Sequence, residues 1–230
     1  WSLRYYQELF INRRSSILFV PPGEAIRNSL VFALTTVGLS LGVGVAGAYL
    51  LARPRRGLST WLDPILMLPL GTSAVTLGFG FILALDQPPL NLRTSPALIP
   101  LAHTLVAFPF VVRSLLPVLC GLNPRWREAA AILGASPLQV WLHVDLPIIG
   151  RAVIVGAVFA FTVSMGEFGA TTLIARPEFP TMSIAIYRLL GQPGTLNYGQ
   201  ALAMSTLLMA VCVIGLLLIE RFRYRDIGEF

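Results

Sequence analysis

The stretch WREAAAILGASPLQVWLHVDLP (126–147) decides the fold, because it is a polar, interrupted segment with long apolar sequence on both sides. Pro124 suits the first turn of a helix, and the Ala-rich residues that follow it favour helix formation. Gly134 can end this helix, since glycine adopts the left-handed conformation freely. The first half of the stretch therefore predicts a short helix that ends at Gly134.

A second short helix is predicted directly after the glycine. Ser136 can cap its start, and Pro137 suits its first turn. We expect the helix to run to about Val144 and to be stopped by Pro147. Together the two helices form a predicted helical hairpin over 121–150.

The sequence around the hairpin is typical of an integral membrane protein. Of its 230 residues, 55% are hydrophobic and 12% are charged, whereas soluble domains are about 25% charged. Each apolar run must be helical, because only a helix satisfies its own backbone groups in lipid. We expect an all-α fold with five transmembrane helices, with the hairpin between the third and the fourth and a kink at Pro69. The five runs cover 28–51, 61–85, 96–115, 152–174 and 200–219.

The placement of arginine predicts the orientation. All 17 basic residues are arginine, and ten of them lie next to the hairpin, between the first two runs or after the last run. Positive residues remain in the cytoplasm, so the hairpin and the C-terminus are expected inside. The predicted division is an extracytoplasmic segment 1–27, a transmembrane domain 28–220 with the hairpin at 121–150, and a cytoplasmic tail 221–230.

The composition also excludes several kinds of site. The net charge of +6 does not indicate nucleic-acid binding, since the basic residues are spaced as membrane topology requires. The absence of lysine excludes a phosphate-binding P-loop and Schiff-base chemistry in this chain. Cys120 and Cys212 have no metal-ligand spacing, and neither His103 nor His143 has a partner for a metal site. No metal ligand is predicted.

The hairpin alone fits three roles: it could lie on the bilayer, pack as an internal loop or present a helix to a soluble partner. Its spacing resembles the EAA loop of the membrane subunits of binding-protein-dependent ABC importers. That loop has Glu-Ala-Ala, three residues, Gly, nine residues, an Ile-like residue, one residue and Leu-Pro. The matching residues are Glu128, Ala129, Ala130, Gly134, Val144, Leu146 and Pro147, with valine at the Ile position.

The resemblance extends over nearly the whole chain. NSL (28–30) is similar to the entry of the permease core, and GEFGATTLIARPEFPTMSIAIYRLL (166–190) is similar to permeases for oxyanions, ferric iron and thiamine. The family core has five spans with the EAA loop between the third and fourth, as counted above. The start at Trp1, without methionine, suggests the second half of a fused permease.

This resemblance implies a multi-pass permease of the bacterial inner membrane that catalyses no bond change and holds no cofactor. ATP would belong to separate ATPase subunits, which grip the second helix of the hairpin. The other implied partners are an extracytoplasmic solute-binding protein, a second permease half or subunit, and membrane lipid. Thiamine or ferric iron is the expected solute, ahead of sulfate or molybdate. The implied ATPase-coupling residues are Glu128, Ala129, Ala130, Gly134, Ser136, Pro137, Leu138, Trp141, Val144, Leu146 and Pro147.

Glu167 lies in an apolar run, where an ionisable residue indicates function. We expect it to line the translocation path or a gate, together with Thr171 and Thr172. Alternatively, the helix breaks near Gly166 or Gly169 and Glu167 simply reaches water at the outer face.

Two other classes of protein remain as alternatives. A secondary transporter or channel would be expected to show internal repeats and charged pairs near the midplane, and no convincing repeat is present. A membrane enzyme would need a cluster of His, Asp or Glu near one interface, which the sequence lacks.

Overall fold

The computed structural model describes residues 3–11, 20–52, 58–86 and 91–225. The arginines at 53, 55 and 56, which support the predicted orientation, lie outside these residues, as do those at 13 and 14, which depart from it because they fall in the segment expected outside. The elements are α1 (Arg4–Glu8), α2 (Pro22–Ala52), α3 (Leu58–Met67), a 3-10 turn η1 (Leu68–Gly71), α4 (Ala74–Leu85), α5 (Leu98–Gly121), α6 (Pro124–Ile132), α7 (Pro137–Val140), a π-helical turn η2 (Trp141–Asp145), α8 (Leu146–Gly166), α9 (Gly169–Ile174), α10 (Met182–Leu190) and α11 (Thr195–Arg225).

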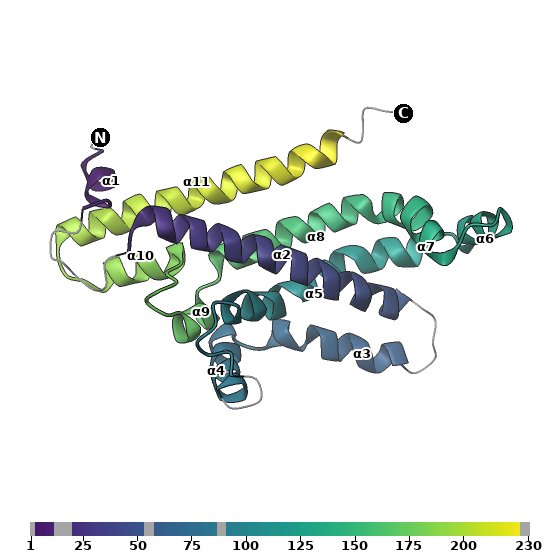
Figure 1. The fold of residues 1–230 in the computed structure, drawn as a ribbon, viewed down its shortest axis with the longest axis horizontal. Helices are drawn as coiled ribbons and strands as arrows, with labels where there is room; N and C mark the ends of the chain where they lie inside the picture. Colours follow the sequence, from purple (N-terminus) through teal and green to yellow (C-terminus); the bar gives the residue numbers. More distant parts are fainter. Residues whose placement is uncertain (1–2, 12–19, 53–57, 87–90, 226–230) are drawn as a thin grey trace.

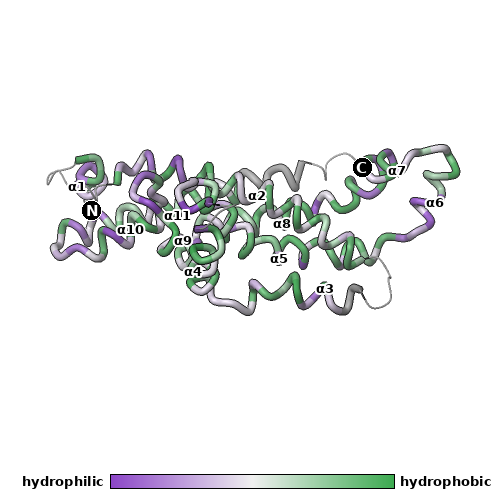
Figure 2. The backbone as a smooth tube through the Cα atoms, turned by 60° about the horizontal axis from the view of Figure 1, so that its bottom comes forward, coloured by the Kyte–Doolittle hydropathy of each residue, from purple (hydrophilic) through white to green (hydrophobic). Residues whose placement is uncertain are grey.

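The long helices run side by side along the longest axis of the molecule (Figure 1). The hairpin helices α6 and α7 lie at one end, and α1 and α10 lie at the other. In Figure 2 the middle of α5 and α8 is hydrophobic, whereas hydrophilic segments gather near α6 and near α1 and α10. This distribution is the one expected of a helical bundle that crosses a bilayer.

Four helices of the described chain are long and apolar enough to span a membrane: α2, α5, the continuous helix Pro137–Gly166, and Thr195–Leu217 of α11. A fifth span is formed if α3 and α4 are counted as one broken segment. The predicted all-α membrane fold is therefore confirmed. The first spanning helix, α2, begins at Pro22, inside the segment that we expected to precede the first span.

The centre of the bundle is formed by α2, α5 and α8. Val111, Leu115 and Ile149 are fully buried there, in one apolar cluster. Small residues let these helices approach closely. A Cβ atom added at Gly44 would lie 2.6 Å from Val111 Cγ1, and one added at Gly156 would lie 3.0 Å from Ser114 Oγ.

The second predicted span is broken rather than kinked. We expected a bend at Pro69, and the chain indeed leaves α3 through the 3-10 turn that contains this proline. The axes of the two halves then differ by 104°. After the bend, α4 packs against α9, where a Cβ atom added at Gly78 would lie 2.8 Å from Ala170 Cα.

The fourth predicted span differs from expectation at both ends. Pro147 does not stop the helix, since the chain stays helical from Pro137 to Gly166. At the other end the helix stops at Gly166, and α9 starts a new helix after Glu167 and Phe168. The break near Gly166, considered as an alternative above, is therefore present, but Glu167 is buried there and does not reach water as that alternative expected.

The end of the bundle opposite the hairpin is fastened by hydrogen bonds between distant segments. Ser29 Oγ accepts a bond from Met182 N at 2.9 Å, and Asn28 Nδ2 donates to Pro180 O at 3.1 Å. These bonds hold the start of α10 against α2. Gln200 Nε2 donates to Glu8 O at 2.8 Å, which joins α11 to α1.

The predicted orientation can be tested with single cysteines at opposite ends of the bundle. Ala131 and Thr195 are both exposed, on α6 and at the start of α11. In a background without Cys120 and Cys212, a membrane-impermeant thiol reagent should label Thr195→Cys from outside and Ala131→Cys only after the inner face is opened. Labelling of both from the same side would contradict the orientation, and labelling in detergent provides the control for reactivity.

Candidate functional site

The turn of the hairpin has the geometry that the sequence predicts. Gly134 adopts φ +85°, and its N–H donates to Ala131 O while Ala135 N–H donates to Ala130 O. These two bonds form the usual glycine stop of a helix. Ser136 then begins α7 with a capping box, in which its hydroxyl accepts from Gln139 N and its own N–H donates to Gln139 Oε1.

The hairpin ends in an exposed apolar surface, which we call the hairpin tip. Its members are large apolar side chains on both sides of Gly134: Trp126, Ile132, Leu133 and Leu138. Ile132 and Leu133 are 84% and 87% exposed, and Leu138 is 65% exposed. Exposed apolar surface of this kind marks an interaction site.

A polar cluster anchors the base of the hairpin to α2. Asp145 is buried, and Arg127 Nε donates to its Oδ1 at 2.8 Å while Tyr49 OH donates to its Oδ2 at 3.1 Å. The guanidinium of Arg127 also lies 6.0 Å from the centre of the Tyr49 ring. A charged pair with further hydrogen bonds fixes geometry strongly, so the two helices of the hairpin and α2 are held in one arrangement.

The second helix of the hairpin, α7, is continuous with the membrane-spanning helix α8. A π-helical turn, Trp141–Asp145, connects α7 to α8. Pro147 has no N–H group to donate. In a regular α-helix its ring would also clash with the carbonyl group of the preceding turn. The π turn ends two residues before this proline, which lies in the first turn of α8. Trp141 is half-buried and lines a pocket of about 600 Å³ with Tyr49, Arg127 and Asp145.

Glu167 lies at the break between α8 and α9, and its side chain is almost fully buried. Oε1 accepts from Ala170 N at 2.9 Å, and Oε2 accepts from Thr171 N at 3.0 Å. The Thr171 hydroxyl donates to Oε2 at 2.6 Å. The carboxylate thus caps the first turn of α9, where the unpaired N–H groups of a helix favour a negative charge.

His103 connects this break to the bundle. It lies on α5 and is 2% exposed. Its Nε2 is 2.7 Å from Thr171 Oγ1 on α9 and 3.5 Å from Glu167 Oε2, and its Nδ1 is 2.8 Å from Ser164 Oγ on α8. Ser164 Oγ in turn donates to Thr36 Oγ1 on α2 at 3.4 Å. One histidine therefore joins the helices around the break.

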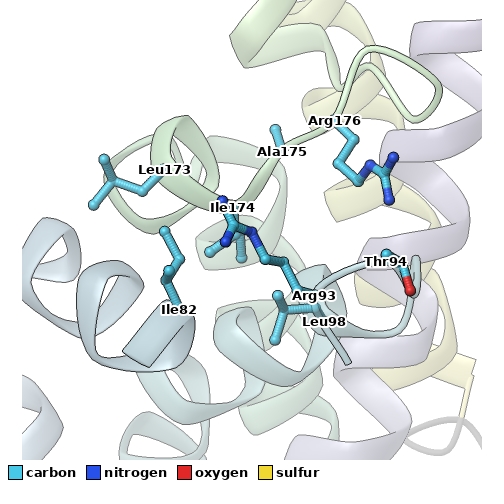
Figure 3. A pocket seen from close by; sticks show the side chains of 8 residues that line it. All are labelled: Ile82, Arg93, Thr94, Leu98, Leu173, Ile174, Ala175 and Arg176. Carbon is cyan, nitrogen blue, oxygen red and sulfur yellow. The ribbon is translucent and has the colours of Figure 1, made fainter. Parts of the chain in front are cut away.

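A pocket of about 340 Å³ lies beside α4 and α9 (Figure 3). Arg93, from the segment before α5, and Arg176, from the segment after α9, both line it, and most of the remaining wall is apolar. Arg93 Nη1 is 3.0 Å from Asp86 Oδ2, and Arg176 Nε is 3.2 Å from Glu178 Oε2.

The structure brings the sequence-predicted residues together in two groups. Most of the predicted coupling residues are exposed: Glu128, Ala129, Gly134, Ser136, Pro137, Leu138 and Pro147. The half-buried ones are Ala130, Val144 and Leu146. Glu167 and Thr171 meet in the buried cluster. Thr172 is exposed and its hydroxyl donates to Phe168 O, directly before α9, so it does not join Thr171.

Sequence reasoning missed three functional candidates, His103, Arg127 and Asp145. His103 was considered only as a metal ligand. The rule that singled out Glu167, an ionisable side chain within an apolar run, applies equally to His103. No local signal pairs Arg127 with Asp145, because the pairing depends on how the hairpin folds back.

Comparison with known proteins identifies the class. No family model matches the chain. The molybdenum transport system permease protein ModB of Escherichia coli is 31% identical over 218 residues, which cover 89% of this chain and 94% of that protein. The permease protein PhnV of Salmonella paratyphi A, named for 2-aminoethylphosphonate transport, is 28% identical over 204 residues, covering 88% and 75%.

Two solved structures have the same fold. A bacterial ABC transporter involved in the import of the acidic polysaccharide alginate aligns with a TM-score of 0.71 and 21% identity, over 98% of this chain and 84% of that one. The inward-facing MetNI methionine ABC transporter aligns with a TM-score of 0.63 and 19% identity, over 88% and 92%.

The helical bundle and its relatives define a multi-pass transport permease of the bacterial inner membrane. The chain belongs to the family of ABC importer permease subunits, as its similarity to ModB shows.

Proposed function

We propose that this permease forms the membrane path for a small solute delivered by an extracytoplasmic binding protein, and that separate ATPase subunits drive it through the hairpin. The hairpin tip is the observation that carries this proposal. Three aliphatic side chains there are more than 60% exposed, beyond the apolar bundle, and they need a soluble partner with an apolar cleft. A second permease half or subunit would complete the path. ATP would be bound by the partner alone.

The proposed solute is a small anion. Two relatives are named for molybdenum and for 2-aminoethylphosphonate, and both solutes carry oxyanion groups. The pocket in Figure 3 offers two guanidinium groups on an apolar wall, which suits an oxyanion better than thiamine or a ferric ion, since both of these are cationic. Each guanidinium has five N–H donors, so the acidic neighbours of Arg93 and Arg176 leave some of them available.

Reconstitution with the co-purified ATPase and the binding protein tests both parts of the proposal. ATP hydrolysis in proteoliposomes should rise with molybdate or 2-aminoethylphosphonate and remain at its basal level with thiamine or ferric iron. Stimulation by a cation alone would overturn the solute class but not the permease role. Failure of any ATPase to co-purify with the intact permease would overturn the coupling role.

Charge variants sharpen the solute test. Arg93→Gln together with Arg176→Gln should raise the anion concentration needed for half-maximal stimulation about tenfold, as expected for the loss of charge-assisted hydrogen bonds. Arg188→Gln, on α10 and outside the pocket, is the matched control and should leave this concentration unchanged.

A further inference from the structure

We propose that the pocket of about 600 Å³ at the base of the hairpin is a binding site for an anionic phospholipid of the cytoplasmic leaflet. Arg127 binds the phosphate of this lipid, and the upper part of an acyl chain lies along α2. The site is separate from the hairpin tip and from the pocket lined by Arg93 and Arg176. It therefore goes beyond the proposed function.

The pocket lies where the bundle leaves the bilayer on the side of the hairpin. Its wall is formed by the last parts of α2 and α5 and by the start of the continuous helix Pro137–Gly166. Tyr49 and Trp141 line it, close to the end of α2 and to the start of that helix. Tyrosine and tryptophan are enriched at the level of lipid headgroups. The pocket is therefore at headgroup depth, in the cytoplasmic leaflet if the predicted orientation holds.

The pocket is polar at one end and apolar at the other. At the polar end, Tyr49 OH donates to Asp145 Oδ2 at 3.1 Å. The apolar end includes Gly42 and Ala46 of α2. Gly42 precedes Tyr49 by seven residues, so it lies about 10 Å deeper along the helix. A molecule with a charged head and an apolar chain, oriented like the lipids of this leaflet, matches the arrangement.

The polar end presents a guanidinium group to a ligand. The hydrogen bond from Arg127 Nε to Asp145 Oδ1 uses one of the five N–H donors of the arginine. The Arg127 side chain is 41% exposed, whereas the Asp145 side chain is 7% exposed and accepts a bond at each oxygen. A ligand therefore meets the guanidinium rather than the carboxylate. Phosphate oxygens suit this group, and basic pockets between helices on the cytoplasmic side bind anionic headgroups.

The apolar end is open on the outer surface of α2. Gly42 and Ala46 are exposed, and the neighbouring Val43 and Leu50 are 48% and 49% exposed. A Cβ atom added at Gly42 would meet no atom within 4 Å. An acyl chain can therefore enter this end sideways from the bilayer. Soluble phosphate would gain nothing from such a groove, so the groove indicates that the phosphate belongs to a lipid.

Two pairs of variants test the two ends. Gly42→Phe fills the apolar end, and Gly38→Phe is its control, since a Cβ atom there also meets open space but lies outside the pocket. Arg127→Gln removes the charge at the polar end. Arg125→Gln makes the same change of net charge at an exposed position of α6, outside the pocket. Gly42→Phe retains the pair of Arg127 with Asp145, so it tests the site even if Arg127→Gln disturbs the hairpin.

Native mass spectrometry of the complete transporter is the readout, because bound lipids are resolved by their mass. The probes are phosphatidylglycerol, phosphatidylcholine and diacylglycerol with identical acyl chains. We expect the unsubstituted protein to retain phosphatidylglycerol about fivefold better than phosphatidylcholine, the factor that one arginine near anionic lipid contributes. Arg127→Gln and Gly42→Phe should lose this preference, whereas Arg125→Gln and Gly38→Phe should keep it.

Three results would overturn the lipid site. Retention of diacylglycerol as strong as that of phosphatidylglycerol would show that the phosphate is not recognised. Displacement of phosphatidylglycerol by an excess of inorganic phosphate would assign the site to a soluble anion. Equal retention by Gly42→Phe and Gly38→Phe would show that another protein segment, and not a lipid, covers the groove. The measurement needs no ATP hydrolysis and works with the permease alone, so its failure is distinct from failure of the proposed function.

Discussion

Gly134→Val should leave the permease in the membrane fraction and lower the recovery of its ATPase subunit by about tenfold, which corresponds to about 1.4 kcal/mol. Gly134 has φ +85°, and no atom lies within 4 Å of the position of an added Cβ. Backbone strain is therefore the whole effect, and a β-branched residue tolerates this conformation least. The turn must change, and the hairpin tip then presents its apolar side chains at another angle.

Asparagine provides the matched control, because it is one of the few residues that adopt the left-handed conformation routinely. Gly134→Asn should therefore retain most of the ATPase in a pull-down assay. The size of the difference is reasonable, since burial of one Leu or Ile side chain contributes about 1.5–3 kcal/mol. Equal, full recovery of the ATPase with both variants would show that the hairpin tip is not the docking surface.

Gly78→Ala should disrupt the protein far more than a single methyl group normally does. The added Cβ would lie within 3 Å of two backbone atoms of Ala170, which cannot rotate away as a side chain does. Overpacking of this kind costs about 1–3 kcal/mol, so the native contact of α4 with α9 should weaken by roughly five- to hundredfold. Both the midpoint of thermal unfolding in detergent and the rate of solute transport should fall.

Gly80→Ala lies two residues further along the same helix and meets open space. It should leave transport unchanged and stabilise the protein slightly, because alanine favours a helix over glycine by about 1 kcal/mol. If the two variants unfold at the same temperature and transport equally well, the packing of α4 on α9 is not required.

The features that sequence could predict are those that depend on neighbouring residues. The ends of α6 and α7 follow from Gly134, Ser136 and Pro137, each of which acts within one turn of its own position. The apolar runs follow from the requirement that a span satisfies its own backbone. Both kinds of signal lie within a few residues or within one helix, so the hairpin and the approximate positions of the spans were predicted correctly.

The features that sequence could not predict depend on contacts between distant segments. The 104° bend after α3 places α4 against α9, about ninety residues further along the chain, and Pro69 indicates only where the bend lies. The role of His103 depends on Ser164 and Thr171, which reach it from two other helices. No spacing in the sequence indicates that these side chains meet, although each is a polar residue in an apolar run.

The π turn at Trp141–Asp145 has a consequence for the direction in which the hairpin points. A π turn holds one residue more than an α-helical turn, and each residue of a helix corresponds to a rotation of about 100°. That extra residue therefore changes the direction in which the hairpin tip points about the axis of α8. The continuous helix Pro137–Gly166 has 30 residues and is roughly 45 Å long, since each residue adds about 1.5 Å. Glu167 directly follows the last residue of this helix. If the helix tilts by about 10° about the hairpin tip, its far end, beside Glu167, is displaced by roughly 8 Å.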